Sequence, residues 1–233
     1  MELTKEQIHY IDSRLENEGV KYWDIRIEML DHVVSDVEKN SKPENSEYEF
    51  KEIVQNAFVA LGWKENFNGS GFEEVLKENF KNIGRKNRDN YKKEVVSFFK
   101  NASLLIIFIL LILSYYLLSN FIPHSQFVKV SYILFSIPVL LFFYESIKLW
   151  RKKIGKSYNK DLSLSSILFS FGILNIIILS MKTEGGEFAL PIEYQKPILF
   201  ILLPIHLVFS YVGYQTYNKT IVKVVNMRNQ LLL

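Results

Sequence analysis

Four apolar stretches follow a charged first hundred residues, and this step in composition constrains the chain more than any other feature. The stretches cover residues 102–121, 128–147, 162–181 and 197–214. Each approaches the roughly 20 residues that a helix needs to cross a hydrocarbon core about 30 Å thick. Buried helices of a soluble protein are the alternative, but runs such as 104–113 are apolar on every side and would leave that protein no polar outer face. We therefore expect four transmembrane helices within residues 102–216.

Lysine and arginine side chains gather beside these stretches in an uneven way. They lie in three places. Before the first stretch are Lys81, Arg85, Lys86, Arg88, Lys92, Lys93 and Lys100; between the second and third are Arg151, Lys152, Lys153, Lys156 and Lys160; and in the tail at 217–233 are Lys219, Lys223 and Arg228. The other two connections are short and poorer in cations. By the positive-inside rule, this pattern predicts a multi-pass membrane protein with both termini in the cytoplasm.

Helix-start and helix-stop signals divide the first 84 residues. Thr4 with Gln7, and Ser46 with Glu49, have the capping-box spacing that satisfies backbone N–H groups in the first turn of a helix. Gly62 stands where a left-handed C-terminal cap belongs. These signals predict short helices connected by turns, one of which covers residues 66–71.

Apolar residues at helical spacing mark the faces that these helices bury. The predicted faces are Ile8, Ile11 and Leu15; Trp23, Ile27, Leu30, Val34 and Val37; Phe50, Ile53, Val54, Ala57, Phe58 and Leu61; and, in a shorter helix, Phe72, Val75, Leu76, Phe80 and Ile83. We expect Leu30 and Phe58 in one common core. The predicted fold class is all-α: a small cytoplasmic helical domain at 1–84, a basic juxtamembrane segment at 85–101, and a four-helix transmembrane bundle.

The N-terminal pattern resembles a known family. The segments that carry the resemblance are Tyr10-Ile11 to Leu15, Asp24-Ile25 with Glu28 to His32, and Phe50 to Ala57 followed by Leu61-Gly62. Over about residues 5–65 they resemble the HAAS-type helical domain of bacterial membrane proteins, which is often encoded beside PadR-like transcriptional regulators. The resemblance implies a signalling role, a transcriptional regulator as the class of cytosolic partner, and no catalytic residues. The chain layout and its richness in Lys, Asn and Ile also resemble membrane proteins of the Bacteroidota. Together these resemblances imply that the membrane is the bacterial cytoplasmic (inner) membrane.

One face of the helix predicted at 21–39 carries acidic residues and a histidine. Glu28, His32 and Asp36 stand four residues apart, a spacing at which a carboxylate and an imidazole can share a divalent metal. The alternative is a solvated acidic face, which we favour because a zinc site needs a third ligand with its own supporting hydrogen bonds. His9 could supply that ligand only if its helix lies alongside. We expect no metal or cofactor, and take Glu28 and Asp31 as candidates for binding a protein partner.

The basic segment at 81–100 also contains Tyr91, Phe98 and Phe99, a mixture that suits nucleic acid or a lipid surface. Because it directly precedes an apolar stretch, we expect anionic lipid headgroups as its partner, at about 1 kcal/mol per cation near the surface. The net charge of the whole chain is only +3, so direct nucleic-acid binding is not expected.

Few polar residues interrupt the apolar stretches. Glu145 lies near the end of the second, where interfacial water or Lys148 can satisfy it. Asn175 and His206 lie deeper, and we expect an interhelical hydrogen bond between them rather than a proton relay, which needs a chain of ionisable groups. Small residues favour close helix packing, within the chain or in a homo-oligomer: Ser166, Ser170, Ser210 and Gly213.

Three classes of function remain open. The absence of cysteine excludes a thiol nucleophile and a Cys-ligated zinc site, and no HExxH helix or Ser/Asp-plus-base set is present, so we do not expect an enzyme. We expect a membrane-anchored signalling or regulatory adaptor whose cytoplasmic domain binds a protein partner. A small transporter, channel or transport subunit is the alternative, and an intramembrane enzyme ranks third.

Overall fold

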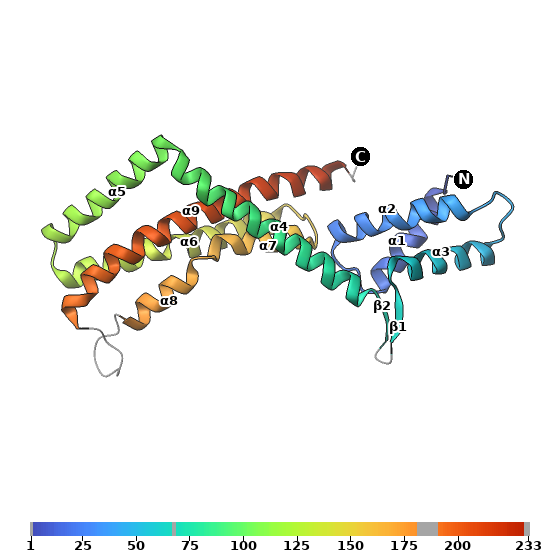
Figure 1. Ribbon diagram of the computed structural model, residues 1–233, viewed down its shortest axis with the longest axis horizontal. Coiled ribbons are helices and arrows are strands. Elements are labelled where there is room, and N and C mark those ends of the chain that lie inside the picture. Colours follow the sequence, from blue (N-terminus) through green and yellow to red (C-terminus); the bar gives the residue numbers. More distant parts are fainter. Residues whose placement is uncertain (1, 67–68, 181–190, 231–233) are drawn as a thin grey trace. The chain divides into compact units, whose positions relative to one another are not determined.

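The computed structural model describes residues 2–66, 69–180 and 191–230, and within them the fold is all-α apart from one short hairpin (Figure 1). The chain forms two compact units. The first, here called the N-terminal unit, comprises Met1–Lys86 together with Ile154–Lys160; the second, the apolar unit, comprises Asn87–Lys153 and Asp161–Leu233.

Three helices build most of the N-terminal unit: α1 (Lys5–Asn17), α2 (Trp23–Asn40) and α3 (Glu47–Leu61). Both predicted capping boxes are confirmed, at Thr4 for α1 and at Ser46 for α3. Hydrogen bonds from the Ser46 backbone and side chain to the Glu49 carboxylate lower the pKa of Glu49. Gly62 ends α3 with φ at 105°, in the left-handed region that favours glycine.

The core of this unit lies between α1, α2 and α3, and Phe58 is fully buried in it as predicted. The face predicted for α2 is only partly right. Its buried residues include Ile25, Met29, Val33 and Val37, whereas Leu30 is half-buried at the edge of the core. The helix is turned relative to the prediction because its apolar residues form a wide stripe, and Met29 occupies the central position that the sequence assigned to Leu30.

The segment after α3 differs from the predicted turn and short helix. Lys64–Asn66 (β1) pairs antiparallel with Gly69–Gly71 (β2). The next helix, α4, then runs without interruption over Glu73–Lys100, so the shorter helix and the juxtamembrane segment are one element. Gly84 does not end it, because an interior glycine costs only about 1 kcal/mol relative to alanine and good helix formers surround it.

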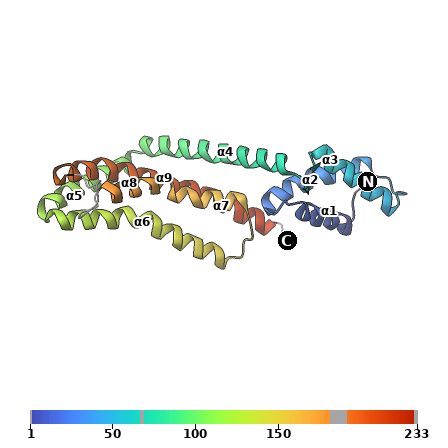
Figure 2. The same ribbon diagram turned by 90° about the horizontal axis from the view of Figure 1, so that it is seen from below.

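Three helices of the apolar unit are long and apolar enough to cross a membrane: α5 (Ala102–Phe121), α6 (His124–Arg151) and the part of α9 (Ile192–Gln230) from Glu193 to Asn229. The bounds of α5 are those predicted for the first stretch. Helices α6 and α9 extend beyond the second and fourth stretches and lie side by side, running in the same direction (Figures 1 and 2).

The third predicted stretch does not form one continuous helix. It consists of α7 (Tyr158–Ser165), a 3₁₀ turn η1 (Ser166–Leu168) and α8 (Phe171–Ser180). The rest of that stretch, and Glu184 and Glu187 after it, lie outside the described residues. Of the predicted four-helix bundle, the described residues therefore contain three uninterrupted helices of membrane length and one broken segment packed against α6 and α9.

Candidate functional site

Asp24, at the start of α2, accepts hydrogen bonds from residues far along the chain. Its Oδ1 accepts from the Tyr158 backbone N–H at 3.0 Å, and its Oδ2 accepts from the Ser157 hydroxyl and the Asn159 backbone N–H, each at 2.9 Å. The Asn159 side-chain amide also donates to Oδ2, at 2.8 Å. These groups open α7, so Asp24 acts as an N-terminal cap supplied by another helix. No local pattern in the sequence predicts this role for Asp24, because its partners lie more than 130 residues away.

Aromatic packing holds the same segment within the N-terminal unit. The Tyr158 ring lies 4.4 Å from the Phe80 ring and 5.4 Å from the Tyr22 ring, measured between centroids. Gly155, with φ at 85°, lies directly beside the Trp23 indole, where an added Cβ would be 3.3 Å from the nearest ring atom. Residues 154–160, which connect α6 to α7, are thus an integral part of this unit.

The acidic face of α2 is largely open. Glu28, Asp31 and His32 are exposed, while Asp36 is half-buried and accepts a hydrogen bond from the Asn40 side chain at 3.2 Å. In the described part of the chain, no group of three or more His, Asp or Glu side chains is arranged to hold a metal ion. His32 and Asp36 instead line a groove of about 270 Å³ between α2 and α3, whose other lining residues are Val33, Ala57, Ala60 and Leu61.

Helix α4 displays its cations on the surface. All the basic residues that the sequence predicted for a lipid surface are exposed: Lys81, Arg85, Lys86, Arg88, Lys92, Lys93 and Lys100. Lys77, in the first turns of the helix, is exposed as well. Towards its C-terminal end, the side chains of Val96 and Phe99 are also more than half exposed. On the opposite side, the Tyr91 hydroxyl donates to the Phe209 carbonyl at 2.7 Å, and burial raises the pKa of Tyr91. The open face therefore combines cations with apolar groups, as helices at a lipid surface do.

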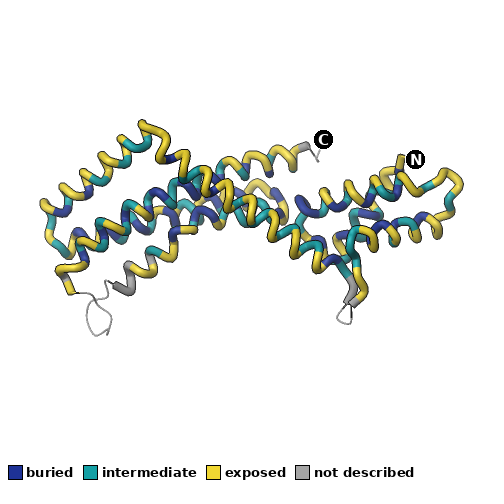
Figure 3. Tube along the Cα trace, viewed as in Figure 1, coloured by how far each residue is buried: buried dark blue, intermediate teal, exposed yellow. Residues whose placement is uncertain are grey.

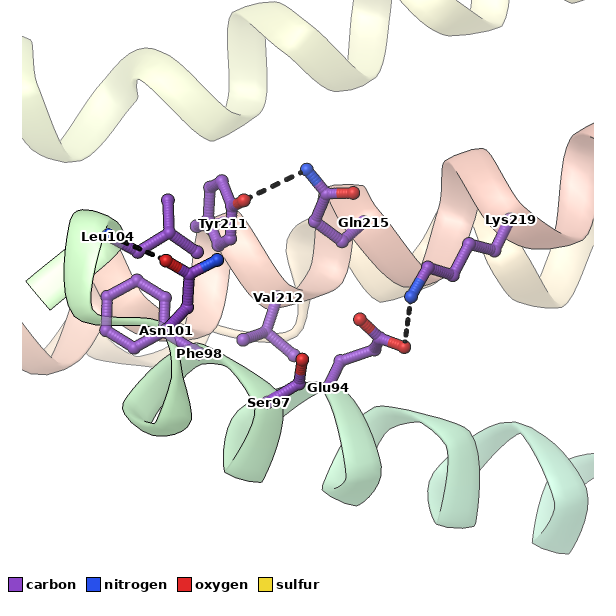
Figure 4. Close-up of a pocket in the computed structure, with 9 residues that line it drawn as sticks. All are labelled: Glu94, Ser97, Phe98, Asn101, Leu104, Tyr211, Val212, Gln215 and Lys219. Atoms are coloured by element: carbon purple, nitrogen blue, oxygen red, sulfur yellow. Dashed lines mark hydrogen bonds and ion pairs between the residues drawn. The ribbon is translucent and has the colours of Figure 1, made fainter.

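A small cavity of about 160 Å³ lies between the C-terminal end of α4 and the middle of α9 (Figure 4). Glu94 and Lys219 form an ion pair at 2.6 Å at one end, Val212 lies in the middle, and Phe98 lies towards the other end. Because Glu94 and Lys219 already neutralise each other, this ion pair serves to hold α4 against α9.

The break in the third apolar segment is held by small polar side chains. Ser166, in η1, accepts a hydrogen bond from the Asn87 amide at 3.1 Å, and the Ser170 and Ser210 hydroxyls lie 2.8 Å apart. Gly213 in α9 faces this turn, and an added Cβ there would collide with the Ser166 carbonyl oxygen. All four predicted small residues thus lie where η1 and α8 approach α9, and Gly213 permits the closest approach.

His206 and Asn175 do not bond to each other. His206 is buried, and its Nε2 lies 3.1 Å from the Phe135 carbonyl oxygen of α6. Its Nδ1 lies near the Ser170 backbone but has no hydrogen bond of normal geometry within the described ranges. The Asn175 side chain is exposed on α8. The predicted pairing is wrong because it assumed one straight helix through residues 162–181. The break at η1 changes the direction of α8, so counting residues along a straight helix does not give the neighbours of Asn175.

Glu145 is the most deeply buried carboxylate among the described residues, with 1% of its surface exposed. The expected pairing with Lys148 is confirmed, with Nζ 3.1 Å from Oε1. The Tyr217 hydroxyl of α9 donates to Oε2 at 2.7 Å, a contact that the sequence analysis missed. Its only signal in the sequence was an acidic residue near the end of the second apolar stretch and a tyrosine just after the fourth.

Comparison of the chain with protein-family models, with curated proteins and with solved structures finds no match. The fold and the sites therefore define the protein by its architecture alone: it is an all-α protein with helices of membrane length and a helical N-terminal unit that has its own core.

Proposed function

We propose that the protein is a membrane-anchored signalling or regulatory adaptor, whose N-terminal unit faces the cytoplasm and binds a cytosolic protein. In this proposal α5, α6, the broken third segment from residue 162 onward and α9 each cross the inner membrane, so both termini are cytoplasmic. The cations on α4 and in the tail support this orientation through the positive-inside rule. The same cations on α4 would contact anionic lipid.

The hydrogen bonds to Asp24 carry the proposal. They make the connection between α6 and α7 part of the same folded unit as α2. A partner that binds α2 and shifts its first turn would weaken or strengthen the hydrogen bonds that hold this connection. Because the connection joins α6 to α7, such a shift would also change how these helices are held. Such coupling suits a regulatory protein and requires no catalytic residues.

The proposed partner surface is the exposed acidic face of α2 with the neighbouring groove lined by His32 and Asp36. Glu28 and Asp31 would pair with basic groups of the partner, and the apolar floor of the groove would accept a small hydrophobic side chain. The resemblance to HAAS-type domains suggests a transcriptional regulator as the partner class.

Capture of a cytosolic partner by the full chain tests this proposal. Glu28→Lys with Asp31→Lys should abolish capture while leaving helicity and membrane insertion unchanged. Glu44→Lys with Glu78→Lys is the matched control, because both residues are exposed acidic groups outside α2. A partner held equally by both double variants would contradict the role of this surface.

One observation favours the alternative function, a small transporter or channel. The third apolar segment is broken at 166–170 beside the buried His206, and broken helices of this kind form substrate and ion sites in many transporters. Solute uptake by the purified protein in sealed liposomes, lost in a His206→Ala variant, would support this function and replace the adaptor proposal.

A further inference from the structure

The C-terminal turns of α6 and the facing turns of α9 enclose a cavity of about 240 Å³. Its lining mixes charged, amide and apolar side chains: Glu145, Lys148, Leu149, Lys152, Tyr217, Asn218, Ile221, Val222, Val225 and Asn226. Pockets for drug-sized molecules are about 300–1,000 Å³. The cavity is therefore suited to a small polar group.

A buried carboxylate organises one wall of this cavity. Glu145 receives hydrogen bonds from Tyr217, at 2.7 Å, and from Lys148, at 3.1 Å, and the Tyr214 hydroxyl lies 3.4 Å away. These partners compensate the cost of burying its charge. They also hold the Lys148 ammonium at the edge of the cavity, where 45% of the Lys148 side chain is still exposed.

The net charge of the residues that line the cavity favours a ligand with one negative charge. Lys148 and Lys152 contribute two positive charges and Glu145 one negative charge, so the lining has an excess of one positive charge. A phosphodiester carries a single negative charge and would neutralise that excess. The Asn218 and Asn226 amides offer donors and acceptors for hydroxyl groups, whereas a trimethylammonium group could neither donate a hydrogen bond to Glu145 nor use the amides.

The surroundings of the cavity favour a lipid over a soluble ligand. Trp150 is 81% exposed and Tyr144 62% exposed on the same end of α6. Exposed aromatic residues beside lysines are typical of the headgroup region of a membrane. Ile147 and Val222 are also more than half exposed and offer an apolar surface to acyl chains.

We propose that this cavity binds the hydroxyl-bearing phosphodiester headgroup of an anionic phospholipid, with phosphatidylglycerol as its simplest form. Lys148 and Lys152 contact the phosphate, and Glu145 with the two asparagines contacts the headgroup hydroxyls. This inference rests on the proposed membrane location of α6 and α9. It is a defined site, separate from the dispersed cations of α4.

The test uses the full chain in nanodiscs of phosphatidylglycerol and phosphatidylcholine, followed by mild detergent extraction and mass spectrometry of the lipids that remain bound. The unmodified protein should retain phosphatidylglycerol selectively. Lys148→Gln with Lys152→Gln should lower that retention about thirtyfold, the combined effect of two cation–phosphate contacts. Lys223→Gln is the matched control, because Lys223 is an exposed lysine of α9 that does not line the cavity.

Two further variants keep the test decisive. Lys152→Gln alone leaves the Glu145–Lys148 pair intact, so its loss of retention cannot come from an unpaired buried carboxylate. Glu145→Gln keeps the size of the side chain and one acceptor oxygen, which can serve Tyr217, but leaves a lining with two positive charges. Selectivity should therefore move from phosphatidylglycerol towards the more highly charged phosphatidic acid. A merely structural role for Glu145 would lower retention of both lipids equally.

Equal retention of phosphatidylglycerol and phosphatidylcholine by the unmodified protein would overturn the inference. Displacement of the bound lipid by soluble glycerol phosphate at comparable concentrations would also overturn it, by assigning the cavity to a soluble ligand. Failure of the protein to enter nanodiscs would instead contradict the proposed membrane location.

Discussion

The two units use apolar side chains in opposite ways. In the N-terminal unit the apolar residues face one another and charged residues face outward. In the apolar unit Ile106, Leu110 and Leu140 are more than half exposed, while Ser131, Glu145 and other polar residues are buried (Figure 3). Water favours the first pattern, whereas hydrocarbon leaves polar groups to find partners between the helices. The exposed surface of the N-terminal unit thus suits water, and that of the apolar unit suits hydrocarbon.

The largest expected effect concerns the core of the N-terminal unit. Phe58→Ala removes a fully buried ring and should cost about 3–5 kcal/mol of unfolding free energy. Hydrogen exchange of the full chain should show lost protection in α1 to α3. Leu110→Ala is the control, because the Leu110 side chain is 59% exposed and does not belong to this core. In that variant the backbone amides of α1 to α3 should remain protected. Equal loss of protection in both variants would remove the distinction between the two units.

The next effect concerns the connection that belongs to the N-terminal unit. Asp24→Ala leaves the Ser157 hydroxyl and two backbone N–H groups without their acceptor, which should cost about 1–3 kcal/mol. Hydrogen exchange should become faster at residues 157–159. Asp31→Ala removes an exposed carboxylate of the same helix and should leave that segment protected. Unchanged exchange in the Asp24 variant would show that this connection is not held by α2.

Close packing in the apolar unit gives a third effect. Gly213→Ala places a Cβ against the Ser166 carbonyl and should destabilise the packing of η1 on α9 by about 1–3 kcal/mol. Gly172→Ala meets open space in α8 and should be neutral or slightly stabilising. Thermal unfolding in detergent compares the two. The account of close packing fails if both variants unfold at the same temperature as the unmodified protein.

The smallest effect comes from a helix cap. Ser46→Ala should cost about 1 kcal/mol, and the cap depends on the ionised Glu49 carboxylate. Because the folded-state pKa of Glu49 is lowered, its contribution is present above the ordinary pKa of glutamate and is lost as the pH falls through the folded-state value. Acid titration of amide exchange in α3 should show this loss, and Glu49→Gln should remove the pH dependence. Identical acid profiles for Glu49→Gln and the unmodified chain would contradict it.

The sequence predicts the N-terminal unit better than the apolar unit, for a physical reason. Capping boxes and apolar stripes are local signals, so α1 and α3 follow from them. The features of this unit that are misjudged are the rotation of α2, with Met29 in place of Leu30, the β1–β2 hairpin, and the uninterrupted run of α4. Helices that are apolar all round carry no stripe, so the sequence cannot orient them. The break at 166–170 remained hidden within an apolar stretch for this reason.

The candidate sites depend on contacts between distant residues, which local patterns do not contain. Asp24 bonds to Asn159, 135 positions away, and Glu145 bonds to Tyr217, 72 positions away. The sequence identified Glu145, His206 and the small residues as unusual for their surroundings. It could not identify their partners, because these depend on how α6, η1 and α9 pack.

The central claim, that the apolar unit crosses a membrane with both termini in the cytoplasm, has a direct test because the chain contains no cysteine. Single cysteines at Ser46, at Ile122 between α5 and α6, and at Asn229 near the end of α9 can be labelled with a membrane-impermeant maleimide. In intact cells with a permeabilised outer membrane, only the cysteine at position 122 should react, and the other two should react after the inner membrane is opened. Labelling of position 46 or 229 before that step would contradict the claim.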